Sequence, residues 1–329
     1  MVQRSKTPRK YSLLWFFAFT FYLPLVAHTA QLPPQFLNFV VALGSHVQKR
    51  ELREVEKKPP EFEWRTEGTG FFYGHLAVDD PESQKRRYQP FLVTAKHVVQ
   101  EHERLRRSDN RGELSIRVNP QDSSSPSEKF PVSSLALSSG SMWFFHPNPD
   151  IDLAIFPINL LKLREQGLQS HFFANDKIVA NTDKLKELEV AAGDGVFILG
   201  FPMNLAGVQR NYVIVRQGVI ARISEMLDRA SRTFLVDAFV FPGNSGGPVV
   251  LKTEVGSIEG TKSQNTAYLI GIVLSYIPYI DVAISAQTQR GRIAFEENSG
   301  LTEILPTDYI DETIKAWHEK NAAASPLKP

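Results

Sequence analysis

Short runs of β-forming residues recur along the chain from Gly68 onward, separated by polar breaks that often contain Gly or Pro. Short strands at such spacing are typical of all-β sandwiches and barrels. The runs cover residues 70–78, 91–94, 115–118, 142–146, 153–158, 195–199, 212–223, 234–241, 248–251, 267–276 and 292–295. Helical patterns are found mainly at residues 159–169 and 308–320. About a dozen strands over some 240 residues favour two packed β-barrels over one sandwich, with a divide near residues 180–195.

Composition excludes several classes of protein. The chain has 329 residues, of which 42% are hydrophobic and 22% charged, as in ordinary globular proteins. Its 37 Lys and Arg residues balance 36 Asp and Glu residues, so no strong field would attract nucleic acid, and we expect no nucleic-acid partner. The absence of cysteine excludes disulfides, thiolate zinc sites, iron–sulfur clusters and a cysteine nucleophile.

The N-terminus carries an export pattern. Basic residues at positions 4, 6, 9 and 10 precede residues 11–27, an apolar run without charge. The run is longer than the core of a usual signal peptide and shorter than the roughly 20 residues that span a bilayer comfortably. Residues 1–30 are therefore either a cleaved signal peptide or a membrane anchor through residues 11–27, with a buried core helix as a weaker alternative. Both main interpretations predict an exported protein, periplasmic or extracellular. Residues 31–65, interrupted by prolines, are interpreted as a lead-in segment.

Three glycines surround a serine in the segment GNSGGP at residues 243–248. Glycines at such density cost conformational entropy and are used where the backbone needs positive φ or a close approach. The segment could be only a glycine-rich turn. A nucleophilic serine, however, requires such a sharp turn with backbone N–H groups nearby, because these groups stabilise the oxyanion that develops during acyl transfer. Ser245 is therefore a candidate nucleophile.

Two further segments carry side chains that could act with this serine. His97 lies in TAKHVV at residues 94–99, and Asp152 precedes the apolar run LAIF at residues 153–156. Either residue alone has an ordinary interpretation, as a surface histidine or as a solvated acid at a strand end. The chain order His, Asp, Ser is that of the chymotrypsin-type triad and differs from the orders in subtilisin and the α/β-hydrolases.

Together these segments resemble the trypsin/chymotrypsin-like serine peptidases, particularly the cysteine-free bacterial branch that includes the high-temperature-requirement proteases. The resemblance covers roughly residues 68–320 and extends to GTGF at 68–71, VFILGFP at 196–202, VRQGVI at 215–220 and DA at 237–238. Residues 269–273 and 292–295 resemble the two strands that wall the specificity pocket.

The resemblance implies an all-β fold of two six-stranded antiparallel barrels with a C-terminal helix. The peptidase domain would cover residues 66–320, with the first barrel at about 66–180, the second at about 190–305 and the helix at 308–320. Residues 321–329 would form a tail, so we expect no peptide-binding PDZ domain.

The same resemblance implies roles for the candidate residues. Ser245 would attack the scissile carbonyl, His97 would accept and return the proton, and Asp152 would orient the imidazole. The N–H groups of Gly243 and Ser245 would form the oxyanion hole. Asp150 is an alternative acid, but Asp152 directly precedes the apolar run, as in the family pattern.

The predicted specificity pocket contains no acidic residue. The segment at 238–242 supplies Phe239, Val240 and Phe241, so a basic P1 side chain would find no counter-charge there. We therefore predict cleavage after small or medium apolar residues. The remaining pocket residues are expected to be Leu274, Ser275 and Tyr276.

Other positions depart from the family pattern or carry no site. Asn244 stands where animal digestive proteases have an aspartate that pairs with a newly cut N-terminus, so we expect no zymogen-style activation. Lys96 is expected to be solvated, because adjacent strand residues point to opposite faces. His97 and His102 do not form the His-Glu-x-x-His zinc motif, and neither a P-loop nor a dinucleotide fingerprint is present. The sequence therefore predicts no metal and no cofactor.

The sequence-based hypothesis is a serine endopeptidase that acts on a protein or peptide substrate through an acyl-enzyme intermediate. The main alternative is a catalytically idle fold of the same type that binds peptides by strand addition. A weaker alternative is an acyl hydrolase that acts on esters.

Overall fold

The computed structural model describes residues 31–48, 61–82, 85–109, 111–138, 140–254, 262–284, 286–287 and 291–324. The predicted signal or anchor segment at residues 1–30 and the last residues of the predicted tail lie outside these ranges. None of the helices in the described ranges has the length and apolar character needed to cross a bilayer.

The first half of the chain forms an eight-stranded sheet. Its strands pair in the order β5-β4-β1-β2-β3-β7-β6, and the short β8 pairs with β2 in parallel. The strands are β1 (Val40–Gln48), β2 (Phe62–Val78), β3 (Arg87–Thr94), β4 (Ser115–Val118), β5 (Glu128–Pro131), β6 (Phe144–Phe145), β7 (Ala154–Pro157) and β8 (Phe173–Ala174).

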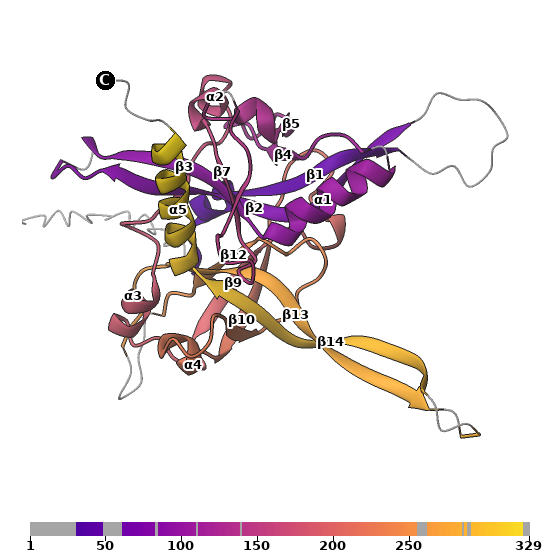
Figure 1. The fold of residues 1–329 in the computed structure, drawn as a ribbon. Coiled ribbons are helices and arrows are strands. Elements are labelled where there is room, and N and C mark those ends of the chain that lie inside the picture. The colour runs from indigo at the N-terminus through magenta and orange to yellow at the C-terminus, as the bar shows by residue number, and fades with distance from the viewer. Residues whose placement is uncertain are drawn as a thin grey trace, which may run out of the picture. The chain divides into compact units, whose positions relative to one another are not determined.

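The second half forms a closed barrel of six strands in the order β10-β11-β14-β13-β12-β9. These strands are β9 (Gly195–Gly200), β10 (Ile214–Arg222), β11 (Phe234–Asp237), β12 (Pro248–Leu251), β13 (Leu269–Ile284) and β14 (Gly291–Pro306). Every pairing around the barrel is antiparallel. β13 and β14 are longer than their barrel neighbours and continue outward as a two-stranded ribbon, drawn in orange at the lower right of Figure 1.

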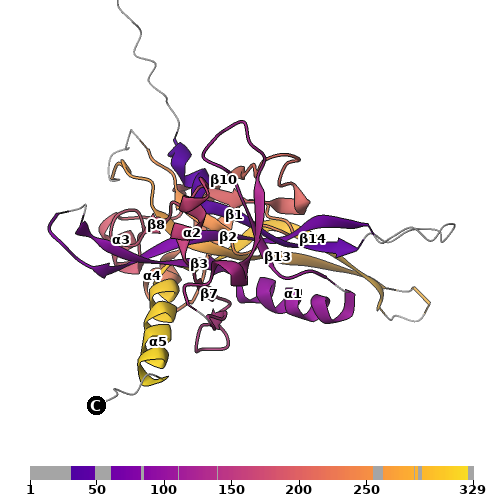
Figure 2. The same ribbon diagram turned by 90° about the horizontal axis from the view of Figure 1, so that it is seen from above.

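The helices are short except for α1 and α5. They are α1 (Lys96–Asp109), α2 (Leu160–Glu165), α3 (Thr182–Glu187), α4 (Ser224–Leu227) and α5 (Asp308–Ala324), with 3-10 turns η1 (Pro34–Phe39), η3 (Val132–Leu135) and η4 (Pro202–Asn204). The view from above separates α5, in yellow, from α1, in purple (Figure 2).

Alternate residues of the central strands enter two different apolar cores. Phe71 and Tyr73 of β2 belong to a core shared with the second half, whereas Phe72 between them belongs to a core confined to the first half. Because successive side chains point to opposite faces of a strand, a strand covered on both faces is a continuous apolar run. The shared core contains Leu199 and Leu269 from the second half, so the two halves are joined by apolar packing.

The C-terminal helix α5 also packs into the shared core. Ile310 and Ile314 are fully buried, and the Trp317 ring meets the Phe91 ring nearly perpendicularly with centroids 5.5 Å apart. The Tyr73 hydroxyl on β2 donates a 2.9 Å hydrogen bond to Asp311. α5 is therefore attached to the first sheet by apolar and polar contacts.

The predicted all-β, chymotrypsin-like architecture with a C-terminal helix is confirmed. The first half differs in detail. Its eight strands include one parallel pair, and the end strands β5 and β6 do not pair with each other, so the hydrogen-bonded sheet is open and not a closed barrel. The interpretation of residues 31–65 as a lead-in is corrected, because Val40–Gln48 pairs with both β2 and β4 inside this sheet. The proline breaks around this segment concealed a strand that is apolar at its start.

The strand predicted to end at Tyr276 continues to Ile284. Pro278 predicts a strand end because it has no N–H to donate, but the register shifts between Tyr276 and Pro278, and this bulge accommodates the proline. Residues 293–295 lie opposite 281–283 on the outer ribbon. Thr302, rather than one of these residues, lies opposite Tyr276, and the assignment of 292–295 to a pocket wall stays a prediction.

Replacing Ile314 by Ala should destabilise the protein by about 2–5 kcal/mol, because the substitution leaves a cavity in the shared core. Denaturant unfolding measures the change. Leu161→Ala on α2, where the side chain is 59% exposed, is the control and should change the free energy of unfolding by less than about 1 kcal/mol. Equal effects of the two substitutions would contradict the packing of α5.

Candidate active site

His97 and Asp152 are brought together by two neighbouring antiparallel strands. β3 ends at Thr94, which lies opposite Ala154 at the start of β7. His97 follows in the first turn of α1, and Asp152 directly precedes β7. The His97 ring nitrogen Nδ1 lies 2.6 Å from Asp152 Oδ2, and the His97 backbone N–H donates to Oδ1 over 2.9 Å. One carboxylate therefore fixes both the ring and the backbone of this histidine.

The electrostatics of Asp152 favour its ionised form. Burial raises the pKa of the carboxyl, but the hydrogen bonds and charge interaction with His97 outweigh burial, and the pKa is lowered from its ordinary value. An ionised carboxylate only accepts hydrogen bonds, so Nδ1 of the ring carries the proton. In the neutral ring Nε2 is then left as a proton acceptor, the tautomer that a general base requires.

Two charged residues close to His97 and Asp152 in the sequence bind other partners. Asp150, the alternative acid, forms a 2.9 Å salt bridge with Arg232, and Asp152 is the acid that contacts His97. The expectation that Lys96 is solvated is wrong, because its ammonium donates to the carbonyl oxygens of Pro149 and Ile151. The strand argument failed because Lys96 begins a helix. Its contacts fix the loop that leads to Asp152.

Residues 243–248, called the serine turn from here on, contact both halves of the structure. Gly243 and Gly246 have φ values of +101° and +82°, which glycine adopts readily. A Cβ at Gly246 would overlap Thr94 Oγ1 and the Thr69 carbonyl oxygen and lie 2.8 Å from Ala95 N. The turn that carries Ser245 therefore lies directly against the end of β3, three residues before His97.

Thr69, which is fully buried, holds this turn from the first half. Its N–H donates to the Ser245 carbonyl over 3.0 Å, and its hydroxyl donates to the Gly243 carbonyl over 2.6 Å. The same hydroxyl accepts a 3.1 Å bond from Phe201 N–H. The sequence drew attention to GTGF at 68–71 only as part of a resemblance and did not predict this role.

The Ser245 hydroxyl donates to the Leu274 carbonyl oxygen over 3.0 Å. Among the described residues no hydrogen bond joins it to His97. The structure thus places the serine turn against the end of β3, from which the chain continues to His97, with the Ser245 hydroxyl directed to β13. In structures without substrate the hydrogen bonds between catalytic groups are often long or absent and tighten on binding.

Two N–H groups of the turn have no acceptor within the described part of the chain. Asn244 N–H donates to Phe241, Gly246 N–H to Val273 and Gly247 N–H to Asn244, whereas the N–H groups of Gly243 and Ser245 have no such bond. These are the two groups predicted to form an oxyanion hole.

The orientation of the first of these N–H groups is set by a neighbouring turn. Met203 N–H donates to the Pro242 carbonyl oxygen over 2.7 Å. No peptide bond of the described chain is cis, so the N–H of Gly243 points away from that carbonyl, toward the side opposite Met203. Met203 and Asn204 both adopt positive φ, at 52° and 61°, and Asn204 is fixed by a 2.7 Å bond from Thr66 N–H. Such backbone strain in non-glycine residues persists where the surrounding contacts enforce it.

The predicted pocket residues are divided between core and surface. Val240 and Leu274 are buried in the apolar cores. Phe239 and Ser275 are exposed, and Phe241 and Tyr276 are half-buried. The Tyr276 hydroxyl donates to Glu296 over 2.9 Å, and the Arg216 guanidinium lies 5.0 Å from the centre of the Phe241 ring.

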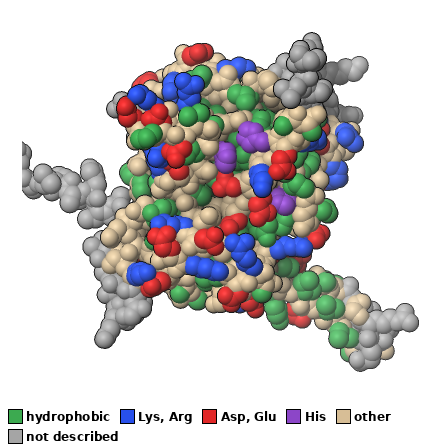
Figure 3. Space-filling view, turned by 60° about the vertical axis from the view of Figure 1, so that its left-hand side comes forward, with side chains coloured by type: hydrophobic (Ala, Val, Ile, Leu, Met, Phe, Trp, Pro, Cys, Tyr) green, Lys and Arg blue, Asp and Glu red, His purple; other side chains and the backbone are tan. Residues whose placement is uncertain are grey.

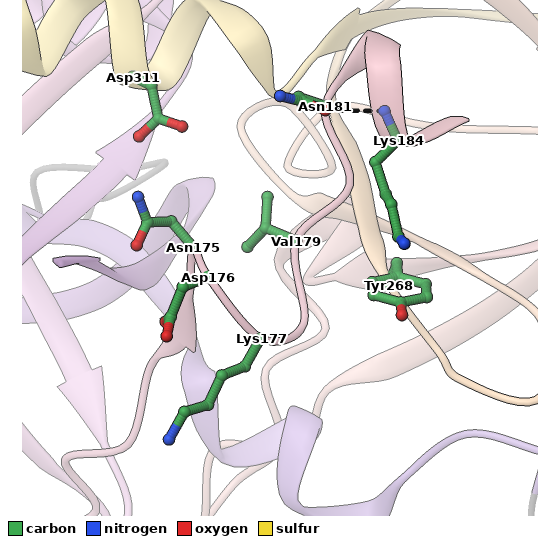
Figure 4. A pocket seen from close by; sticks show the side chains of 8 residues that line it. All are labelled: Asn175, Asp176, Lys177, Val179, Asn181, Lys184, Tyr268 and Asp311. Atoms are coloured by element: carbon green, nitrogen blue, oxygen red, sulfur yellow. Dashed lines mark hydrogen bonds between the residues drawn. The ribbon is translucent and has the colours of Figure 1, made fainter. Parts of the chain in front are cut away.

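Two cavities in the described part of the chain lie away from these residues. One of about 350 Å³ lies beside Asn175, Tyr268 and Asp311 (Figure 4), and one of about 220 Å³ lies beside Trp64 and Lys129. None of the predicted site residues lines either cavity. Among the described residues no group of three His, Cys, Asp or Glu side chains could hold a metal ion.

A barrel and a sheet that share one core, with the His97–Asp152 pair and the Ser245 turn where they meet, define the chymotrypsin-like fold. Comparison with protein families agrees, since residues 68–255 match the trypsin-like peptidase domain, and this is more than half of the chain. The chain belongs to this family. None of the curated proteins compared with the chain matches it.

Replacing Gly246 by Ala should destabilise the protein by about 2–5 kcal/mol, since backbone strain at positive φ adds to overpacking against Thr69 and Thr94. Gly167→Ala is the matched control. Its φ is +71°, but nothing lies within 4 Å of an added Cβ, so only the strain of about 1–2 kcal/mol is expected. Thermal unfolding of both variants measures the difference, and equal losses would rule out close packing of the serine turn.

Proposed function

We propose that the chain is a serine endopeptidase in which His97, Asp152 and Ser245 act as the catalytic triad. The observation that supports this most strongly is the combination of a carboxylate-held histidine with a serine turn that offers two free N–H groups. Membership of the trypsin-like peptidase domain family supports the same chemistry.

The reaction would begin with rotation of the Ser245 hydroxyl from the Leu274 carbonyl toward His97. The serine oxygen then bonds to the scissile carbonyl carbon while its proton passes to His97 Nε2, and Asp152 stabilises the imidazolium. The carbonyl oxygen, now negative, is bound by the N–H groups of Gly243 and Ser245. His97 returns the proton to the leaving amine, and water hydrolyses the acyl-enzyme by the same steps in reverse order.

We further propose a preference for small or medium apolar P1 residues. The segment Phe239, Val240 and Phe241 carries no acid that would bind a basic side chain. We also propose that the protein is exported, because the basic and apolar pattern of residues 1–27 is that of a signal peptide or anchor.

One observation favours the alternative of an idle, peptide-binding fold, namely the Ser245 hydroxyl bonded to Leu274 instead of His97. If that orientation persisted with substrate, the serine would not be activated. The test must therefore report on the reactivity of Ser245 itself.

Treatment with a fluorophosphonate probe should label Ser245, and the label should be absent in Ser245→Ala and His97→Ala. Asp152→Asn should lower kcat about 10⁴-fold, because the amide oxygen would stay bonded to the His97 N–H and the amide NH2 would donate to Nδ1, which favours the tautomer with the proton on Nε2. Ser134→Ala, which changes an exposed serine of a surface turn, is the control and should be labelled normally. Absence of labelling in folded wild-type protein would refute the proposal and favour the binding module. Cleavage of esters without cleavage of peptides would favour the acyl hydrolase.

Replacing Thr69 by Val should lower kcat about tenfold or more with little change in KM, because the buried Gly243 carbonyl and Phe201 N–H lose their partner. Thr313→Val is the matched control. It is equally buried, but its hydroxyl donates to Tyr309 within α5. Steady-state kinetics and thermal unfolding distinguish positioning from stability, and equal losses of kcat in the two variants would contradict the role of Thr69.

A further inference from the structure

The strand that contacts the candidate nucleophile leaves the barrel with one edge free. Val273 exchanges backbone hydrogen bonds with the serine turn, to Gly247 and from Gly246, and the Leu274 carbonyl accepts from Ser245. β12 pairs with β13 only as far as Ile272. From Ser275 to Ile284 the described backbone of β13 pairs with β14 alone. Within the described part of the chain, the outer edge of β13 therefore begins beside Ser245 and runs outward along the ribbon without a strand paired to it, and Pro278 is the one residue there that has no N–H to offer.

The ribbon is apolar on both faces, which is unusual for a structure surrounded by water. Ile280, Val282 and Ile284 are 46–64% exposed on one face, and Tyr279 is 59% exposed on the other. Ile293 and Phe295 of β14 lie opposite Ala283 and Asp281, on the same face as Tyr279. Figure 3 shows hydrophobic side chains gathered on the projecting ribbon.

Apolar side chains on both faces of the ribbon favour the addition of a further strand to its edge over contact with a flat partner. A flat partner such as a membrane or a sheet would cover one face and leave the other in water. An extended polypeptide added to the free edge of β13 directs alternate side chains to both faces, and each meets an apolar neighbour there. Unpaired edges of this kind bind peptides by strand addition.

We propose that the free edge of β13 from Ser275 to Ile284 binds an extended segment of the substrate polypeptide, far beyond the residues next to the scissile bond. This inference rests on the proposed peptidase function and assigns a substrate class to it, namely unfolded, β-forming apolar segments. β13 runs away from Ser245, so an antiparallel substrate, the more stable pairing, approaches the serine with its N-terminal side on the ribbon. At about 3.3 Å per residue, the edge accommodates about ten substrate residues before the cleavage site.

Charge on the ribbon refines the class of segment. Asp281, Glu296 and Glu297 lie along it, and Glu296 already accepts the Tyr276 hydroxyl. Apolar segments that also contain lysine or arginine would be attracted to these carboxylates, whereas acidic segments would be repelled.

The test compares three fluorogenic peptides that share one cleavable core. The first carries eight extra N-terminal residues of Thr, Val and Lys, the second carries eight of Gly and Ser at the same end, and the third carries the Thr, Val and Lys residues at the C-terminal end. The first should be cleaved with a kcat/KM about tenfold above that of the bare core, and the other two within about twofold of it. Equal rates for all peptides, or a gain only from the C-terminal extension, would overturn the inference.

Substitutions on the ribbon test whether it causes the gain in kcat/KM from the N-terminal extension. In Ile280→Ser with Ile284→Ser, the ratio of kcat/KM for the long and bare peptides should fall to about one. Leu161→Ser, which removes an equally exposed apolar side chain from α2, should keep the wild-type ratio. An unchanged ratio in the double variant would overturn the inference. Sedimentation provides a further check, since a wild-type dimer that the double variant abolishes would assign the ribbon to a second copy of the chain.

Two measurements separate this inference from the proposed function. Failure of both probe labelling and core cleavage would refute the peptidase itself. In Ser245→Ala, which cannot cleave, the long peptide should slow amide hydrogen exchange at alternate residues between Ser275 and Ile284, and the bare core should not. Absence of this protection would overturn strand addition even where core cleavage is normal.

Discussion

The candidate site depends on the attachment of the serine turn to Thr69. Thr69 belongs to β2 in the first half, and its N–H and hydroxyl bind two carbonyls of the turn from the second half. Its own carbonyl accepts a bond from the Thr94 hydroxyl at the end of β3. These bonds are buried, where an unpaired polar group is costly. A single residue thus couples the strand that leads to His97 with the turn that carries Ser245, and the shared apolar core holds the two halves in this register.

The sequence pointed to the residues of the candidate site but not to the residues that hold them in place. The order of His97, Asp152 and Ser245 was informative because each residue lies in a distinctive local segment, and the structure brings the first two into contact. The closeness of the serine turn to β3 could be expected from its glycines, since they indicate close backbone approach. Thr69 could not be found in this way, because its partners are more than 100 residues distant and its bonds depend on the tertiary fold.

Parts of the fold were missed for physical reasons that differ from one element to another. The strand at residues 91–94 was predicted, but the direction of Lys96 was argued as if strand geometry continued past Thr94, whereas the chain begins α1 at Lys96. Periodicity in so short a run does not distinguish a strand from a helix. β1 was concealed by flanking prolines, although its apolar residues pack into both cores. The ribbon was missed because Pro278 normally ends a strand, and here a bulge accommodates it.

The ribbon and the serine turn are connected through the backbone of β13. A two-stranded hairpin is marginally stable in water by itself, and this one exposes apolar side chains on both faces. Two hydrogen bonds stabilise the ribbon where it leaves the barrel. Asn298 donates to the Val240 carbonyl, and the Ser299 hydroxyl donates to the Ile277 carbonyl. The same region is joined through Val273 to Gly246 and Gly247 of the serine turn. A third strand on β13 would stiffen the ribbon and, through these bonds, the turn, because added pairing reduces the freedom of the strand that both share. The proposed binding along the ribbon and the orientation of Ser245 would thus be linked through the backbone of β13.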